Sequence, residues 1–415
     1  MILLCNLNTY VGGGETLVIR LAQYLHEEGY SYKILLMGGE NCWALNQAKK
    51  LQLNWVTWPS TVDSIHYQKE AESVDTLVKI EKIFHSQSDL KIFTFCMRDL
   101  HNLLYIFSRL KNIKTSFAHG IYHQDDVYYL SSLSLRPKKI INFNKRLADK
   151  LFEKNAITFM NQHGLSNTLS SEILNIKNLE KKATFIPIPI PIDGEIHPKK
   201  YKGDGKIKII SISRFATFKV GAVLGIMRAI KNKKNIQLTI IGQGPWSSYL
   251  YLWIALNRAK NIKIISGVMP DGLGAYIDDC DIGYAQGTSI LEIAKRGLPV
   301  IIAPYSKLSD VLNKNFETLG VFGEVRGEYA FGDVLDLKSH KTIDIYKCIE
   351  KIQDNHIKYA KLSSEYLMEF SSQKLFKEII NLVENSQFHG HDQFFEKISP
   401  PPLKVWIKKI IERLN

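Results

Sequence analysis

Short apolar runs alternate with longer amphipathic stretches along almost the whole chain, and this alternation limits the possible folds more than any other feature. It is typical of β-α units stacked on a parallel sheet, because strands covered by helices on both faces read as continuous apolar runs. The clearest predicted helix, residues 15–28, carries Leu17, Leu21 and Leu25 on one face. The strands predicted in the first half cover residues 1–5, 32–37, 53–57, 91–96, 114–118, 139–143 and 156–160. The fold class is therefore α/β.

The second half repeats the pattern after a proline-rich connector. Pro187, Pro189 and Pro191 stand at alternate positions, which forces an extended, stiff segment and indicates a domain boundary. A chain of 415 residues exceeds what one hydrophobic core usually holds, so two domains are expected. The predicted strands here cover residues 183–192, 207–213, 237–241, 263–266, 281–285, 300–303 and 318–322. The predicted helices cover residues 222–231, 247–259, 273–278 and 289–296, and helices dominate residues 344–384.

The five cysteines and the N-terminus indicate a cytoplasmic protein. The cysteines are odd in number and scattered, without a Cys-x-x-Cys pair, which favours free thiols in a reducing compartment and argues against a zinc site. No basic segment precedes the apolar residues 1–5, so they predict a buried strand and not a signal peptide. No stretch approaches the roughly 18–20 apolar residues that span a bilayer.

The formal net charge of +13 is the unusual feature of the composition. Such a charge attracts anions, which include nucleotide sugars, nucleic acids and acidic membrane surfaces. A general enrichment in lysine would explain it equally well. The lysines are dispersed and form no recognisable nucleic-acid-binding module, so no nucleic acid partner is predicted.

The C-terminal tail opens with three prolines and continues as a short amphipathic helix. One face of that helix carries Leu403, Trp406, Ile407, Ile410 and Leu414. It could lie on an anionic membrane surface, which would make the protein peripheral to the inner face of the cytoplasmic membrane, or it could pack on the protein. Because it is short for an independent helix, packing is slightly favoured.

Two cations, Arg214 and Lys219, follow the predicted strand 207–213. They therefore lie at the carboxyl end of a strand, where open α/β sheets bind ligands. Arginine offers a planar fork and lysine a mobile point charge, a suitable pair for two adjacent phosphates. Two solvated loop cations are the alternative, and in isolation the more common one.

Two glycine-containing segments follow later strands. Gly242 and Gly244 end the next strand and permit close approach of the backbone to a ligand, although a plain turn uses glycines equally. Gly287, Thr288 and Ser289 can present backbone N–H groups to a phosphate at a helix start, with Glu292 one turn further on. The alternative is a capping box formed by Ser289 and Glu292, with Gly297 as a C-cap and Pro299 preventing continuation of the helix.

In the first half, Gly12, Gly13 and Gly14 join the first strand to the first helix and would admit an anion or sugar to the backbone. They are not a dinucleotide fingerprint, because Leu17 stands where that motif needs a small residue, and Glu40 lies at an awkward distance for a ribose-binding acid. Polar residues also follow two further strands, as Arg98-Asp99 and as the segment that begins with His119. A structural histidine is the alternative for His119.

Together these segments resemble the family 4 retaining glycosyltransferases of the GT-B fold, and the resemblance covers nearly the whole chain. It depends on the order and spacing of four segments: Gly12–Glu15, Arg214 with Lys219, Gly242–Pro245 and Gly287–Pro299. The fold it implies has two Rossmann-like domains facing across a cleft. Residues 1–190 would bind the acceptor and 191–365 the nucleotide sugar, while the helices of 366–415 would return to the first domain.

The resemblance also assigns roles to residues. Arg214 and Lys219 resemble the pair that binds the donor diphosphate, and Glu292 matches the second Glu of the Glu-x7-Glu motif, which holds the ribose hydroxyls. The amides of Gly287, Thr288 and Ser289 would meet the phosphates, with Gly242 and Gly244 nearby. From the acceptor domain, Gly12, Gly13 and Gly14 would line the cleft, and His119 resembles the histidine that contacts the transferred sugar.

The chain departs from the family pattern at two positions. Tyr284 stands where the first Glu of Glu-x7-Glu is expected, which obscures the identity of the donor sugar, and Val220 replaces the Gly that should follow Lys219. The Gly-Thr-Ser-x-x-Glu form resembles that of some divergent members, so divergence is preferred to loss of activity.

The implied function is metal-independent transfer of a sugar, with retention, from a nucleotide-diphosphate-sugar to a saccharide or lipid-linked saccharide. Cell-surface polysaccharide or lipopolysaccharide biosynthesis is the expected setting, and no cofactor beyond the donor substrate is expected. Two alternatives stay open, a nucleotide-sugar-binding protein without transfer activity and a nucleotide-sugar epimerase on the same fold. A nicotinamide dehydrogenase is disfavoured by the glycine spacing.

Overall fold

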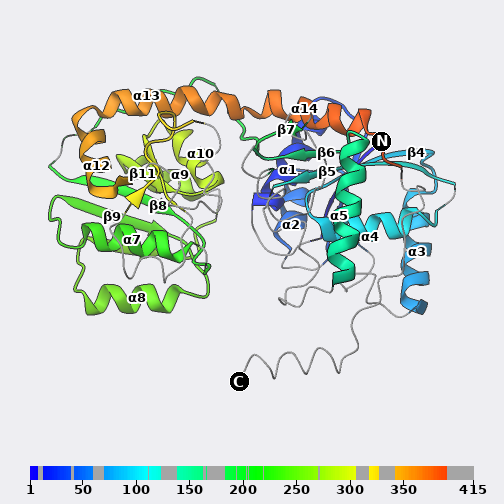
Figure 1. Ribbon diagram of the computed structural model, residues 1–415, viewed down its shortest axis with the longest axis horizontal. Helices are drawn as coiled ribbons and strands as arrows, with labels where there is room; N and C mark the ends of the chain where they lie inside the picture. Colours follow the sequence, from blue (N-terminus) through cyan, green and yellow to red (C-terminus); the bar gives the residue numbers. More distant parts are fainter. Residues whose placement is uncertain are drawn as a thin grey trace. The chain divides into compact units, whose positions relative to one another are not determined.

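The computed structural model consists of two compact units (Figure 1). Unit 1 contains residues 1–189 and the segment from Gln373 onward, and unit 2 contains Ile190–Ser372. The structure describes residues 1–7, 13–38, 42–58, 70–110, 112–122, 138–161, 165, 183–192, 194–201, 203, 205–217, 219–269, 272–304, 317–326 and 342–389. Each unit is built on a parallel sheet of its own.

The sheet of unit 1 has the strand order β3-β2-β1-β4-β5-β6-β7, with every neighbouring pair parallel. Its strands are β1 Ile2–Asn6, β2 Tyr32–Leu36, β3 Trp55–Thr57, β4 Asp89–Thr94, β5 Lys114–Ile121, β6 Ile157–Phe159 and β7 Thr184–Phe185. The connecting helices are α1 Gly13–Glu27, α2 Trp43–Lys50, α3 Glu70–Phe84, α4 Met97–Phe107 and α5 Lys138–Glu153. The chain thus runs outward in one direction through β3 and then returns to the centre at β4, as in doubly wound folds.

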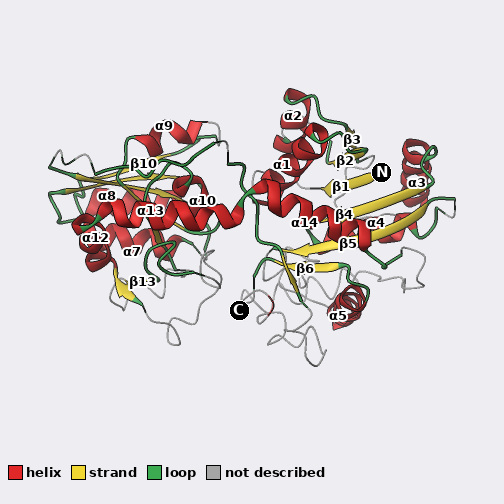
Figure 2. Ribbon diagram, turned by 90° about the horizontal axis from the view of Figure 1, so that it is seen from above, coloured by secondary structure: helices red, strands yellow, loops and turns green. Residues whose placement is uncertain are grey.

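The central strands of unit 1 are buried on both faces. All five residues of β1 are buried, and β1, β4 and β5 lie side by side in Figure 2. Alternating side chains of one strand point to opposite faces, so such a strand must be apolar throughout, as Ile2–Asn6 nearly is.

The sheet of unit 2 has the order β10-β9-β8-β11-β12, again entirely parallel. Its strands are β8 Ile207–Ile212, β9 Ile236–Ile241, β10 Ile262–Ile265, β11 Ile282–Ala285 and β12 Val300–Ile302. Its helices are α7 Val220–Ile230, α8 Ser247–Leu256, α9 Leu273–Asp278, α10 Thr288–Ala294, α12 Ile345–Asp354 and α13 His356–Leu367, which the short turn η5 Met368–Phe370 follows. A small antiparallel pair, β13 Glu317–Thr318 and β14 Ile343–Asp344, lies beside them.

The C-terminal helix α14, Ser372–Asn385, belongs to unit 1 although it follows the helices of unit 2 in sequence. Its Phe376 ring lies 5.3 Å from that of Tyr24 in α1. Beyond the helix, the carbonyl of Phe388 accepts a 2.9 Å hydrogen bond from the N–H of Phe117 in β5. The last described helix therefore returns to the first unit.

Three sequence predictions about elements need correction. Residues 139–143, predicted as a strand, lie in α5, because the helical spacing continues through the buried Leu147 and Leu151. Only Thr184–Phe185 forms a strand within 183–192, and 318–322 contributes only Thr318 to β13, with Val321 and Phe322 in isolated bridges. Gly12, Glu40 and the tail that begins at Pro400 lie outside the described residues.

Candidate functional site

Two segments about seventy residues apart in sequence meet at the centre of the sheet of unit 2. Strands β8 and β11 are parallel neighbours, and Ile212 is the register partner of Ala285. Because both strands end there, the loop that carries Arg214 and the start of α10 leave the sheet side by side. The strand order reverses between β8 and β11, and the carboxyl edge at such a point is where open α/β sheets bind ligands.

The loop after β8 is anchored by a buried phenylalanine between its two cations. Phe215 is fully buried, and its N–H donates to the carbonyl of Gln243 at 3.0 Å. Arg214, one residue earlier, is exposed. Lys219 is half-buried and is the N-cap residue of α7, with its own N–H bonded to the carbonyl of Ala216. The loop therefore holds both cations close to the end of β8.

The surroundings of Lys219 disfavour its charged form. Burial, and to a smaller extent the positive charge of Arg214, together lower the pKa of Lys219 to about 8. Among the described residues, no ion pair joins either cation to an acidic side chain. A bound anion would relieve both the desolvation of Lys219 and its repulsion by Arg214, so the pair is suited to anion binding.

The two glycines after β9 let a second loop pack directly on this one. A Cβ at Gly242 would collide with the carbonyl oxygen of Ser213, and one at Gly244 would lie 2.7 Å from the carbonyl oxygen of Phe215. The indole Nε1 of Trp246 also donates to Thr217 Oγ1 at 3.3 Å. In the structure, these glycines thus shape the cation loop through backbone packing.

The helix α10 begins at Thr288 and has Gly287 as its N-cap, with no side-chain cap hydrogen bond. Gly287 has φ 60° and ψ −144°, a conformation that glycine adopts far more readily than other residues. The capping-box alternative for Ser289 and Glu292 is therefore wrong, because Ser289 is already inside the helix. Glu292 is half-buried one turn from the start, and the N–H groups of Thr288 and Ser289 come too early in the helix to have a partner within it.

Tyr284 is a core residue. It lies within β11, its side chain is 1% exposed, and its hydroxyl donates to the carbonyl of Ala222 in α7 at 3.2 Å. Only Gln286 and Gly287 separate β11 from α10, so the position eight residues before Glu292 falls inside the strand. The side chain at this position packs beneath α7.

Gln286 is a residue that the sequence analysis missed. Its side chain is 5% exposed at the end of β11, and its Nε2 donates to the carbonyl of Pro304, just beyond β12. A carbonyl oxygen can only accept, so this bond orients the amide and directs Oε1 away from Pro304. Oε1 is buried and has no hydrogen-bond partner among the described residues. In the sequence, only its position directly before Gly287 distinguishes it, and that position does not reveal the burial or the orientation of its amide.

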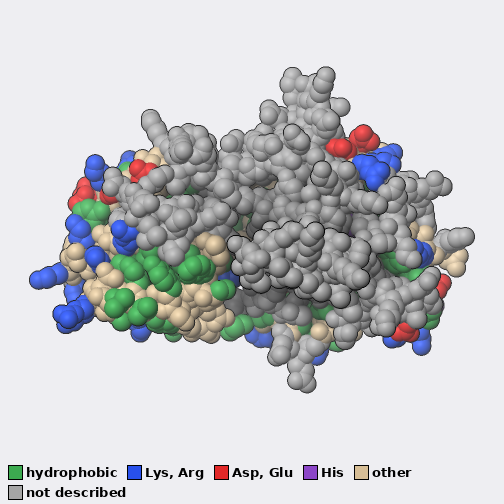
Figure 3. Space-filling model, turned by 60° about the horizontal axis from the view of Figure 1, so that its bottom comes forward, with side chains coloured by type: hydrophobic (Ala, Val, Ile, Leu, Met, Phe, Trp, Pro, Cys, Tyr) green, Lys and Arg blue, Asp and Glu red, His purple; other side chains and the backbone are tan. Residues whose placement is uncertain are grey.

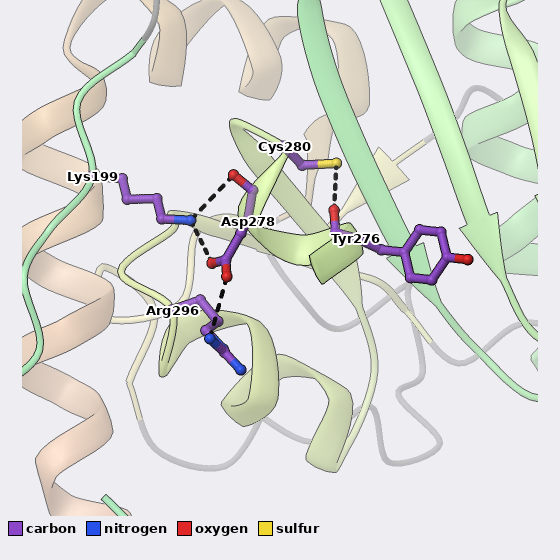
Figure 4. Close-up of polar contacts among 5 residues, drawn as sticks. All are labelled: Lys199, Tyr276, Asp278, Cys280 and Arg296. Atoms are coloured by element: carbon purple, nitrogen blue, oxygen red, sulfur yellow. Dashed lines mark hydrogen bonds and ion pairs between the residues drawn. The ribbon is translucent and has the colours of Figure 1, made fainter. Parts of the chain in front are cut away.

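The far end of α10 is held by an ion-pair network (Figure 4). Asp278, at the end of α9, accepts hydrogen bonds from Lys199 Nζ at 2.7 Å and Arg296 Nη1 at 3.3 Å. Gly297 has φ +77°, and a Cβ there would collide with the carbonyl of His197. These contacts fix the C-terminal end of α10 and so help to fix the direction in which its first turn points.

One family profile matches a part of this chain. Residues 193–330 match a sequence profile of the family described as "Glycosyl transferases group 1", a range that includes every site residue of unit 2 named above. No curated protein matches the chain by sequence.

Solved structures share the fold along both units. A glycosyltransferase from Rickettsia africae is 15% identical, with a TM-score of 0.63, and the match covers 92% of this chain and 97% of that one. Anabaena HepE in complex with UDP is 13% identical, with a TM-score of 0.60 and coverage of 92% and 99%. The lipopolysaccharide outer core galactosyltransferase WaaB is 11% identical, with a TM-score of 0.58 and coverage of 92% and 98%.

The fold is GT-B. This confirms the fold class expected from the sequence, two parallel α/β units with C-terminal helices that cross back to the first. The match to group 1 supports a glycosyltransferase. In GT-B terms the candidate site described so far belongs to the second unit.

In unit 1, the described residues that the sequence singled out lie inside helices or strands and not in loops. His119 lies inside β5 and is fully buried, with its Nδ1 2.8 Å from the hydroxyl of Thr94 in the neighbouring strand. Asp99, in α4, accepts a 3.2 Å hydrogen bond from the N–H of Leu7, directly after β1. Gly13 and Gly14 form the first turn of α1. The contact of His119 and the glycines with sugar or acceptor therefore stays a prediction.

The described residues offer neither a cluster of metal ligands nor a membrane-spanning helix. No group of three or more His, Cys, Asp or Glu side chains among them could hold a metal ion. None of the helices formed by these residues is both long and apolar enough to cross a membrane.

Proposed function

We propose that this protein is a family 4 retaining glycosyltransferase that transfers a sugar from a nucleotide-diphosphate-sugar to a saccharide or lipid-linked saccharide. Cell-surface polysaccharide or lipopolysaccharide biosynthesis is the proposed setting. The observation that carries the proposal is the meeting of the Arg214–Lys219 loop with the start of α10 at the carboxyl ends of β8 and β11.

The donor diphosphate fits the position where the Arg214–Lys219 loop meets the start of α10. The exposed guanidinium of Arg214 can bind phosphate oxygens in a bidentate manner, while Lys219 supplies a half-buried point charge. The backbone N–H groups of Thr288 and Ser289 would add neutral donors from the first turn of α10. Anabaena HepE was solved with UDP, so uridine diphosphate is the first candidate for this chain.

Two hydrogen-bond acceptors near the proposed position of the phosphates could bind hydroxyl groups of the donor. Glu292, one turn into α10, is proposed to bind the ribose hydroxyls. The oriented Oε1 of Gln286 is a second acceptor in the adjacent strand end and would accept from a hydroxyl or N–H group of the donor. A bound donor would then satisfy a buried carbonyl oxygen that has no hydrogen-bond partner in the described part of the chain.

Charge stabilisation is the main catalytic contribution that these residues can make. As the bond between the sugar and the diphosphate breaks, negative charge grows on the departing diphosphate, beside Arg214, Lys219 and the first turn of α10. Fixed cations and N–H groups stabilise that charge more than they stabilise the ground state. Because the protein supplies these cations, the proposed reaction needs no metal ion.

The acceptor side of the proposal concerns unit 1, where Gly12–Gly14 would line the acceptor site and His119 would contact the transferred sugar. A contact with an anionic membrane surface through the tail is part of the same proposal. Deletion of residues 400–415 tests the tail, because a shortened protein that partitions with membranes as the full chain does would rule it out.

The experiment that tests the donor site is a thermal-shift screen of the wild type and Lys219→Ala against UDP, GDP, dTDP, CMP and ADP sugars, with NAD(P)H included. We expect a rise in Tm with one diphosphate sugar, absent in the variant. The stabilisation should follow the ratio of ligand concentration to Kd. No rise with any donor would contradict the site.

Transfer itself needs a second measurement. Incubation of the stabilising donor with a panel of saccharide and lipid-linked acceptors should give a product whose anomeric configuration, read by NMR, matches that of the donor. An inverted product would exclude retention. Conversion of the donor without any acceptor would instead favour the epimerase, and binding without conversion would favour the inactive homologue.

A further inference from the structure

Helix α8, Ser247–Leu256, is apolar on two faces. Its inner face packs on the core of unit 2 through the fully buried Leu250, with Trp253 and Ile254 half-buried beside it. Its outer face carries Tyr251, Leu252 and Leu256, which are 45%, 57% and 74% exposed. Helices on the surface of soluble proteins normally turn polar residues outward, so this outer face needs a separate explanation.

The exposed residues of α8 form one continuous stripe. They are Ser248, Tyr251, Leu252, Ala255 and Leu256, which follow the i, i+3, i+4, i+7, i+8 spacing of a single helix face. Helix α12, of the same length and in the same unit, exposes only polar residues, namely Lys347, Glu350, Gln353 and Asp354. The apolar outer stripe is thus a property of α8 and not of helices in this unit generally.

The sequence around α8 contains no acidic residue. From Gly205 to Pro270 there are eleven Lys and Arg and no Asp or Glu, so this stretch alone contributes 11 − 0 = +11 to the formal net charge of +13. Two of the eleven, Arg214 and Lys219, belong to the candidate donor site. Six others lie close to the ends of α7 and α8 in sequence: Lys231, Lys233, Lys234, Arg258, Lys260 and Lys263. We call these six the basic cluster.

The basic cluster is held together at one edge of the sheet. The side-chain amide of Asn261 donates to the carbonyls of Ile230, Lys233 and Ile236, which ties the turn after α7 to the turn after α8. Both turns precede strands, so they lie at the amino edge of the parallel sheet, whereas Arg214 and Lys219 lie at the carboxyl edge. The cluster is therefore separate from the candidate donor site.

The apolar stripe and the basic cluster are neighbours. Asn257 directly follows Leu256 of the stripe, and its Oδ1 accepts a 3.1 Å hydrogen bond from the Nζ of Lys231 in the cluster. Figure 3 shows a hydrophobic surface, on the unit at the left of the view, with Lys and Arg side chains along its border. Among the described residues, no ion pair joins any member of the cluster to an acidic side chain.

We infer that the outer stripe of α8 and the basic cluster form a docking surface for an anionic membrane. Leu252 and Leu256 would enter the boundary between headgroups and acyl chains, Tyr251 would lie at headgroup level, and the cluster would face lipid phosphates. The inference rests on the membrane part of the proposed function and assigns a contact of its own, independent of the tail, to a folded helix of unit 2.

Charge decides between a membrane and a second copy of the chain as the occupant. In a two-fold symmetric dimer the same surface occurs on both sides, so two basic clusters would lie near each other and repel. An anionic bilayer instead offers apolar depth for the leucines and negative charge for the cluster. The membrane therefore accounts for both parts of the surface.

The test is flotation of the full-length protein with two kinds of vesicle, pure phosphatidylcholine and phosphatidylcholine containing about one third phosphatidylglycerol. We expect binding to the anionic vesicles, weakened by salt. The double substitution Leu252→Ser with Leu256→Ser should lower the partition coefficient about tenfold or more, since it removes two large apolar side chains from the bilayer. Lys231→Gln with Lys234→Gln, Arg258→Gln and Lys260→Gln should abolish the preference for anionic vesicles.

The matched control is Val78→Ser with Met368→Ser, which removes two hydrophobic side chains of similar exposure, 57% and 51%, elsewhere on the chain. It should leave partitioning unchanged. Folding is monitored through Tm, and the thermal shift with the nucleotide sugar should persist in the α8 variant because the donor site is at the other edge of the sheet.

Three results would overturn the inference. These are no binding of the wild type to anionic vesicles, equal binding of the α8 variant, or a dimer in solution that the α8 variant loses without any vesicle binding by the wild type. Failure of the donor screen with intact vesicle binding would count against the proposed function alone.

Discussion

The five strands of the unit 2 sheet follow the order of the first five strands of unit 1, but the two units differ at the edge of the sheet where ligands bind. In unit 1, described polar groups at the carboxyl ends of the central strands are engaged with each other, as Thr94 is with His119 and Asp99 with the N–H of Leu7. In unit 2, the corresponding edge presents Arg214 and the half-buried Lys219. Neither of these cations forms an ion pair with an acidic side chain among the described residues. The same topology therefore supports an internally bonded edge in one unit and an edge prepared for an anion in the other.

Removing a cation from the edge of unit 2 should have the largest effect. Arg214→Ala and Lys219→Ala should each lower kcat/KM for the donor about 100- to 1000-fold, because each removes charge stabilisation of the departing diphosphate. The control is Lys206→Ala, at the opposite end of the same strand, which should change the rate little. Equal losses in all three variants would show that only the overall positive charge matters.

Glycine substitutions compare the packing of the two edges. Gly242→Ala in unit 2 should destabilise the protein by about 1–3 kcal/mol, since the new Cβ collides with the Ser213 carbonyl. Gly14→Ala in unit 1 meets no atom within 4 Å and lies in α1, so it should raise the free energy of unfolding by about 0.5–1 kcal/mol. Denaturant titration measures both.

The Gly14→Ala variant also tests the acceptor role of the glycine run. If these glycines line the acceptor site, the stabilised variant should show a raised KM for the acceptor with an unchanged KM for the donor. An unchanged acceptor KM would remove Gly14 from the site.

The pKa of Lys219 predicts how the binding of a diphosphate at the edge of unit 2 depends on pH. The free protein holds this pKa at about 8, and a bound diphosphate raises it, so binding takes up a proton above that pH. Affinity for a nucleoside diphosphate should therefore fall about tenfold between about pH 7 and about pH 9. In Lys219→Arg, which stays charged, calorimetry should show that this dependence is lost; its persistence would assign the titration to another group.

The smallest effect is expected in unit 1. Thr94→Val keeps the shape of the side chain but removes the hydroxyl that meets His119, which should cost about 0.5–1.5 kcal/mol of stability. If His119 serves only the sheet, kcat stays unchanged in this variant. A fall in kcat with unchanged stability would show that the bond orients His119 for the reaction.

The sequence predicted some parts of the structure much better than others. Every strand of the unit 2 sheet was expected within a residue or two, because its isoleucine-rich runs are bounded by loops and glycines. The run 139–143 was assigned to a strand but is helical in α5. A short apolar run shows no clear helical or strand periodicity, and here the helical spacing appears only when the buried Leu147 and Leu151 are included.

The residues of the candidate site were also predictable only in part from the sequence. Arg214, Lys219 and Glu292 could be named from local patterns, but Gln286 could not, since nothing near it in sequence indicates that Pro304 orients its amide. Tyr284 read as a missing acid in sequence, and its burial beneath α7 shows that the position lies in the core.

The sequence by itself determined most of the strands and helices and the positions of the loop cations and glycines, because these depend on neighbours within a few residues. Only the tertiary structure decided that β8 and β11 pair, that Arg214 and Gly287 therefore leave the sheet together, and that α8 keeps an apolar face outward. The physical reason is that strand pairing and burial join residues tens of positions apart, and no local pattern specifies which distant partner completes a contact.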